Sequence, residues 1–264
     1  MKKMFLLAAT ALLLTSCSKK SDPGTEEPTK TEPTVLLTKV TNVTPNDRDN
    51  GKIQAVFTYN GKQLIKAEVN QQFDGRFAAT HFLTYNAQGQ LASTAINHYS
   101  YNAANFLTST VSYSGNNVSK ILLYKTSGVL GTTNDFTYAD GKLTRWFDNS
   151  QQEIVYTYNS SGNCTNQVVK EYANAVPNGY VITFDYLTFD NKHSVSSALP
   201  YWFYFMANAS IAKNCDVPGV NNVVTESPNA TYYYEYNSNG YPTKIRRVEG
   251  GSENVYTYEY ITVN

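Results

Sequence analysis

The chain has 264 residues, with 21 basic and 21 acidic side chains and therefore no formal net charge. A chain with balanced charge lacks the excess of basic residues that nucleic-acid binding usually requires, so no nucleic-acid partner is expected. Tyrosine dominates the aromatic residues, with 22 Tyr against 12 Phe and 2 Trp. This bias favours strands over helices, because aromatic and β-branched side chains suit a pleated, half-buried surface.

Residues 1–17 have the pattern of a lipoprotein signal peptide. Two lysines precede an apolar stretch, residues 5–14, that is too short to span a bilayer. Leu14-Thr15-Ser16-Cys17 reads as a lipobox, which predicts cleavage before Cys17 and a lipid on its thiol. The alternative is an ordinary secretory signal in which Cys17 is incidental. A lipid anchor makes the membrane the first expected partner, since each buried methylene contributes about 0.8 kcal/mol.

Residues 18–34 are rich in Lys, Glu, Thr and Pro and contain almost nothing apolar. They are expected to form a disordered tether, and residues 35–264 a single all-β domain. The residue directly after the lipobox cysteine is Ser18 rather than Asp. A residue other than Asp at this position resembles the outer-membrane sorting signal of bacterial lipoproteins. The predicted location is the outer membrane, facing the periplasm or the cell surface.

A short phrase recurs along the predicted domain: a strand ends in Tyr, a turn with Asn or Gly follows, and an apolar residue comes next. It occurs at 59–64, 85–91, 101–107, 138–143, 158–162 and 236–240. The segments between the turns alternate with period two. Pairs such as Asn60-Gly61 accommodate the positive φ of tight hairpin turns. Successive short-linked hairpins predict an all-β antiparallel meander that curls into a barrel or a strongly coiled sheet.

The tyrosine ladders leave two interpretations open. The inner wall of the sheet is partly wet, or the sheet has an exposed Tyr-rich face. The rhythm breaks at residues 190–226, where a short helical or irregular aromatic insertion is predicted near 196–210, capped by Ser197. This run covers one end of the sheet, or it forms a ligand platform.

The predicted ligand contacts are aromatic residues near the two Trp positions. They are Tyr201, Trp202 and Tyr204 in the insertion, with Trp146 second. Cys164 and Cys215 are a candidate disulfide in an oxidising envelope, and two buried free thiols are the alternative. His81, His98 and His193 show no metal-ligand spacing, so no metal or cofactor is predicted.

The charged residues offer no catalytic motif. Asn46–Gly51 superficially suggests a calcium loop, but its glycine falls one place early, and a turn explains it better. Lys244, Arg246 and Arg247 are predicted as solvated strand positions beside Glu249. Acidic residues are scattered along the strands: Glu68, Asp74, Asp148, Glu153, Asp185, Glu235 and Glu259. Glycoside hydrolysis needs only two of them at a suitable separation, so a polysaccharide hydrolase is the alternative function.

The Tyr-Asn-x-x-Gly-x-Leu phrase distantly resembles the Tyr-Asp repeats of Rhs and teneurin-type shells. Together with the lipobox, the tether and the aromatic insertion, it is similar to a family of Bacteroidetes cell-envelope lipoproteins of unknown function with a porin-like barrel. That resemblance implies the architecture and no catalytic residue. The predicted function is a non-catalytic binding or scaffold module for a glycan, a peptide or a partner protein. A membrane-spanning pore is the least favoured reading.

Overall fold

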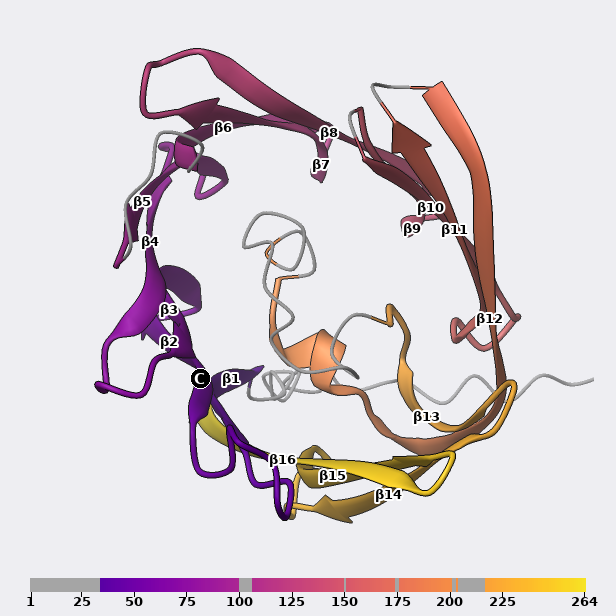
Figure 1. Cartoon of the computed structure of the whole chain (residues 1–264). Coiled ribbons are helices and arrows are strands. Elements are labelled where there is room, and N and C mark those ends of the chain that lie inside the picture. Colours follow the sequence, from indigo (N-terminus) through magenta and orange to yellow (C-terminus); the bar gives the residue numbers. More distant parts are fainter. Residues whose placement is uncertain (1–33, 100–105, 150, 174–175, 201–202, 204–216) are drawn as a thin grey trace, which may run out of the picture. The chain divides into compact units, whose positions relative to one another are not determined.

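The computed structural model describes residues 34–99, 106–149, 151–173, 176–200, 203 and 217–264. Within them the strands form a closed antiparallel barrel that follows the order of the sequence, and β1 pairs with β16 to close it. The predicted all-β meander and its curling into a barrel are confirmed. Figure 1 shows the strands arranged as a ring.

The strand bounds are β1 (Thr34–Asn42), β2 (Ile53–Asn60), β3 (Gln63–Gln71), β4 (Phe77–Tyr85), β5 (Leu91–His98), β6 (Phe106–Ser114), β7 (Asn117–Lys125), β8 (Leu130–Ala139), β9 (Lys142–Asp148), β10 (Gln152–Tyr158), β11 (Cys164–Ala173), β12 (Val176–His193), β13 (Asn221–Glu226), β14 (Ala230–Tyr236), β15 (Pro242–Glu249) and β16 (Ser252–Val263). A single 3-10 helix, η1 (Val195–Ala198), stands between β12 and β13 in the described part of the chain. The predicted signal peptide and most of the predicted tether, residues 1–33, lie outside the described residues.

The core lies inside the ring of strands. Alternate residues of β2, Ala55 and Phe57, are buried, whereas Thr58 beside them is exposed. In Figure 1, η1 lies within the ring. Phe203, which follows it, is fully buried and packs edge-on against Phe57 and His81, with ring centroids 5.7 and 5.6 Å apart. Burying each such side chain contributes about 1.5–3 kcal/mol, so the inner faces of the strands and this segment stabilise each other.

The outer face of the barrel carries ion pairs, one of them within β3 (Lys66–Glu68) and the others between neighbouring strands. Outward residues alternate with buried inward ones such as Val40, Ile121 and Ile245. The pairs are Lys39–Glu259, Lys66–Glu68, Lys120–Asp135, Arg145–Glu153, Lys170–Glu153, Lys244–Glu235 and Arg246–Glu253. A membrane-spanning barrel has an apolar band at these positions and its polar residues inside. This barrel has ion pairs on its outer face, beside exposed apolar side chains such as Ile65, Phe82 and Leu130, and a mainly apolar core.

The repeated turns use the asparagine side chain as a hydrogen-bond acceptor. Oδ1 of Asn86 accepts from the N–H groups of Gln88 and Gln90, at 3.0 and 2.9 Å. Asn159 and Asn237 make the same two contacts in their own turns. Gly89 closes the first turn at a φ of 76°, where a side chain would be strained. Asn therefore recurs because one side chain satisfies two turn N–H groups.

Two of the recurring tyrosines link their hairpin to the preceding one. The Tyr85 hydroxyl donates to the carbonyl of Leu64 at 2.8 Å, and the Tyr158 hydroxyl donates to that of Leu143 at 2.6 Å. In both cases the acceptor is the apolar residue that follows the previous turn. The rings pack against the core, and their hydroxyls bind backbone rather than needing water. These two rings are half-buried, whereas Tyr233 on β14 is 51% exposed, so tyrosines occur on both faces of the sheet.

The aromatic insertion begins with η1, and Ser197 lies within that helix. Its Oγ donates to the carbonyl of Ser194 at 2.6 Å, and Ser194 occupies the N-cap position. The prediction that Ser197 caps the helix is therefore wrong. The turn starts earlier because Val195 and Ala198, three residues apart, are both buried.

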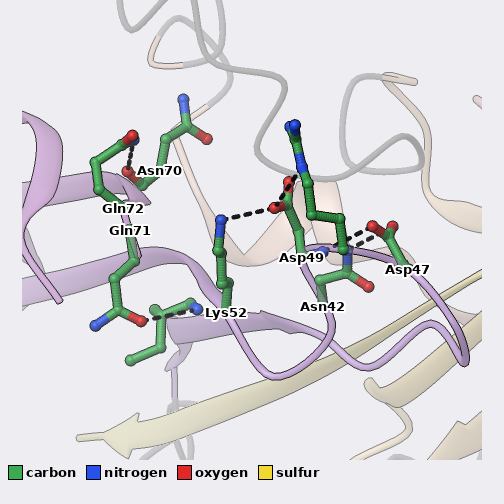
Figure 2. Close-up of polar contacts among 9 residues, drawn as sticks. Asn42, Asp47, Asp49, Lys52, Asn70, Gln71 and Gln72 are labelled. Carbon is green, nitrogen blue, oxygen red and sulfur yellow. Dashed lines mark hydrogen bonds and ion pairs between the residues drawn. The ribbon is translucent and has the colours of Figure 1, made fainter. Parts of the chain in front are cut away.

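The loop between β1 and β2 is held by its own polar side chains, as Figure 2 shows. Asp47 accepts from the Asp49 N–H at 2.8 Å and from the Asn42 side chain at 3.1 Å. Asp49 binds the Lys52 ammonium at 2.7 Å. These carboxylates are satisfied within the loop, so the segment is a turn, as the sequence predicted. Across the described residues, no group of three or more His, Cys, Asp or Glu is placed to hold a metal ion.

Candidate functional site

A cavity of about 350 Å³ opens among the hairpin turns at one end of the barrel. We call it the turn-end pocket. Its walls come from the β2–β3, β4–β5 and β6–β7 turns, from the inner side of β8, and from Pro200 after η1. Its volume falls at the small end of the range of ligand sites, about 300–1,000 Å³.

Three tyrosines of the repeat line the turn-end pocket: Tyr85, Tyr113 and Tyr138. Each ring is half-buried. Burial raises the pKa of Tyr85 and of Tyr138 to about 12, and it also raises that of Tyr113. The three phenols therefore stay neutral at physiological pH. They present aromatic faces on which a flat apolar ligand surface stacks.

The remaining polar lining consists mainly of amides. The side chains of Gln63, Gln90, Asn116 and Asn117 supply donors and acceptors, and Lys62 is the single charged residue among the lining residues. Among the described residues that line it, none has a carboxylate, imidazole or thiol. Such a surface stacks on a ligand and hydrogen-bonds its hydroxyl or amide groups, but it lacks the paired carboxylates that glycoside hydrolysis requires.

Sequence reasoning missed these amides because they stand in turns, where Asn and Gln have an ordinary conformational explanation. The usable signal was the spacing of the repeat. Turns that recur after every second strand of a meander lie at the same end of the barrel, so their side chains converge. That convergence brings Gln63, Gln90 and Asn117 together from three successive hairpins.

The predicted contact Trp146 lies in the interior on β9. It is 8% exposed, and its indole N–H donates to Oδ1 of Asn134 at 2.9 Å. It does not line the turn-end pocket. The predicted contacts Tyr201, Trp202 and Tyr204 lie outside the described residues, directly after the pocket-lining Pro200 in sequence. Ligand contact by these four residues stays a prediction.

Cys164 is a free, buried thiol at the start of β11, and its Sγ donates to the carbonyl of Asn166 at 3.3 Å. Burial raises the pKa of this thiol to about 12, which favours its protonated form. Cys215 and Cys17 lie outside the described residues. The disulfide between Cys164 and Cys215 and the lipidation of Cys17 both stay predictions.

Most of the scattered carboxylates, on which the alternative of a polysaccharide hydrolase was based, form ion pairs with Lys or Arg. Glu235 binds Lys244 and Glu259 binds Lys39, at 3.0 and 2.9 Å. Glu153 binds both Arg145 and Lys170 across three strands. Asp74 binds Arg76 at 2.7 Å beside a second cavity of about 320 Å³, and this contact lowers the pKa of Asp74 to about 2. Most of these pairs lie on the outer face. Glu68 lines the second cavity beside which Asp74 lies, and both carboxylates are paired with cations, Glu68 with Lys66 and Asp74 with Arg76.

A charged cluster also lies in the interior, centred on Arg247. The prediction of a solvated side chain is wrong for Arg247, which is 8% exposed. On β15 it shares the inner face with Ile245, whereas Lys244 and Arg246 point outward and pair there. Its guanidinium donates to the Tyr232 hydroxyl at 3.0 Å and to Glu249 at 2.5 Å, and it lies 3.6 Å from Glu226. Burial opposes this charge, but the bonds to Glu249 and Tyr232 outweigh it and raise the pKa of Arg247.

These features define a closed β-barrel protein with a mainly apolar core, a buried charged cluster at Arg247 and ion pairs on the outer face. Within the described residues, no helix is long and apolar enough to cross a bilayer. No protein-family model and no curated protein matches the chain.

Solved structures with similar folds include two porin-like proteins. One is from Bacteroides uniformis, with 14% identity, 85% of this chain and 96% of that chain covered, and a TM-score of 0.42. The other is from Bacteroides vulgatus, with 13% identity, 86% and 99% coverage, and a TM-score of 0.37. A TcdB2-TccC3-TEV structure matches at 15% identity over 76% of this chain and 9% of that chain, with a TM-score of 0.28. At these values the likenesses assign neither a family nor a function.

Proposed function

We propose that this protein is a lipid-anchored cell-envelope protein whose barrel binds a glycan at the turn-end pocket without catalysing a reaction. The observation that carries the proposal is the chemistry of that pocket. Three neutral tyrosines and four amide side chains converge on it, and none of its lining residues in the described part of the chain is acidic. Sugars present apolar ring faces beside hydroxyl groups, so tyrosine faces and amides complement both parts of the ligand.

The outer face supports anchoring rather than spanning. Ion pairs occur on the outer face at several places around the barrel, including Lys39–Glu259 between β1 and β16 and Lys120–Asp135 between β7 and β8. Each Lys or Arg at the bilayer midplane of a spanning barrel costs about 2–4 kcal/mol. A barrel with this surface faces water, and the predicted lipid on Cys17 would hold it at the membrane.

The binding proposal predicts a saturable complex with neutral oligosaccharides. Titration calorimetry of the full chain carrying Cys17→Ser would measure it, with uronic-acid oligosaccharides as the charged comparison. Gln90→Ala removes one amide from the pocket and is expected to weaken binding about 3- to 10-fold, because one hydrogen bond is lost.

The matched control is Gln88→Ala. Gln88 stands in the same turn, is exposed and does not line the pocket, so this variant is expected to bind like the parent. Equal losses in both variants would place the site elsewhere. The absence of saturable binding to every oligosaccharide tested would refute the glycan proposal.

The anchoring proposal predicts that Cys17→Ser moves the protein from the membrane fraction to the soluble fraction. The reason is the loss of the acyl chains, which supply the membrane affinity. Fractionation with metabolic labelling by a radioactive fatty acid checks both points. A variant that stays with the membrane, or a parent chain that takes up no label, would contradict the anchor.

A further inference from the structure

The barrel is closed, but β12 is far longer than the strand it meets on one side. β12 has 18 residues and β13 has 6. On its first edge, β12 pairs with β11 from Val176 to Asp185. On its second edge, it pairs with β13 only from Tyr186 to His193.

One hydrogen bond fixes which backbone groups point to the second edge. The Ser227 N–H donates to the carbonyl of Asp185 at 2.8 Å, so the groups of Asp185 face the β13 side. Backbone groups of a strand alternate between its two edges. The N–H and C=O of Val181 and Thr183 therefore face that side as well. Within the part of the chain that the structure describes, no strand pairs with them.

The side chains along this edge do not protect it. Natural edge strands usually carry charges, or are covered, because an unpaired edge is a template for another strand. Residues 176–184 contain no charged residue. Tyr180, Val181 and Leu187 are 53%, 55% and 62% exposed. Pro177 and Gly179 interrupt the tip of the hairpin, which leaves Val181–Phe184 as the part available for pairing.

We propose that this edge of β12 pairs antiparallel with the same edge of a second copy of the chain, giving a two-fold symmetric dimer. A two-fold axis places a strand antiparallel to its own copy, so any free edge offers matching donors and acceptors. An uncharged segment meets its copy without the like-charge repulsion that disfavours most such pairs. The exposed apolar side chains would be partly covered in the same contact.

The test is the oligomeric state of the full chain carrying Cys17→Ser, measured by sedimentation equilibrium over a range of concentrations. The parent is expected to form a dimer. Thr183→Pro is expected to weaken that dimer about tenfold or more, since it removes one edge N–H from each copy. That N–H points away from β11, so the β11–β12 ladder keeps its hydrogen bonds.

The matched control is Thr183→Val, which keeps the N–H and the shape and is expected to dimerise like the parent. Unchanged near-ultraviolet circular dichroism in both variants verifies the fold. Slowed hydrogen exchange of the Val181 and Thr183 amides at high concentration would locate the contact. A parent that stays monomeric, or a dimer that Thr183→Pro leaves intact, would overturn the proposal. Neither result bears on ligand binding at the turn-end pocket.

Discussion

Replacing Arg247 with leucine is expected to lower the free energy of unfolding by about 3–5 kcal/mol. The guanidinium and the Glu226 carboxylate are both buried, and Tyr232 donates a hydrogen bond to that carboxylate. Removing the cation leaves Glu226 as an uncompensated charge in the interior, which accounts for most of the cost. Urea denaturation followed by tryptophan fluorescence measures the change.

Two variants separate this effect from general damage. The double variant Arg247→Leu with Glu226→Leu removes both charges and is expected to recover most of the lost stability. Arg246→Leu removes the neighbouring outward cation, whose pair with Glu253 is largely solvated, and is expected to cost less than about 1 kcal/mol. Equal losses for Arg246→Leu and Arg247→Leu would contradict the interior assignment.

Acidification from pH 6.5 to pH 4 is expected to remove about 3 kcal/mol of stability through His81 alone. His81 is 2% exposed, and neither ring nitrogen has a hydrogen-bond partner within the described part of the chain. Burial, with a smaller contribution from His98, lowers the pKa of His81 from 6.5 to about 4. Between these values the unfolded chain binds a proton that the folded chain excludes, so stability falls as the pH falls. Above pH 6.5 both states are neutral at His81, and its effect vanishes.

The comparison that isolates this effect is His81→Leu against the parent, with unfolding free energies measured from pH 7 to pH 4. The variant is expected to show a shallower decline, because the remaining slope comes from other groups. His193→Gln is the control, since His193 is exposed and stacks on Tyr241, and its curve is expected to run parallel to that of the parent. Parallel curves for His81→Leu and the parent would show that His81 does not contribute.

The fold was predictable because its signals are local. Segments that alternate with period two predict the strands, and short turns such as Asn86–Gly89 predict the links between them. Each of these signals lies within a few consecutive residues. The tyrosine hydroxyl contacts were not predictable in this way. Tyr85 and Leu64 are 21 residues apart, and their meeting depends on the register between successive hairpins.

The candidate site was harder to predict from the sequence, because it too depends on the register between distant strands. Arg246 and Arg247 are neighbours in sequence, yet one faces water and the other the interior, and only the register of β15 decides which. The carboxylates that left hydrolysis open are paired with cations on adjacent strands, such as Glu153 with Lys170. The turn-end pocket arises from three turns that the sequence shows separately and the barrel brings together.

The tyrosine links have a consequence for how a barrel of this kind changes in size. The β4–β5 and β10–β11 hairpins are each attached to the preceding hairpin by a tyrosine that they carry themselves, and every pairing except β1 with β16 joins sequence neighbours. A duplicated hairpin therefore brings its own attachment, and the closing pair stays the same. Because barrel diameter grows with strand number, the circumference of such a barrel is set by how many hairpins the chain contains. Duplication of a hairpin within the gene can therefore widen the barrel without requiring a new type of contact between strands.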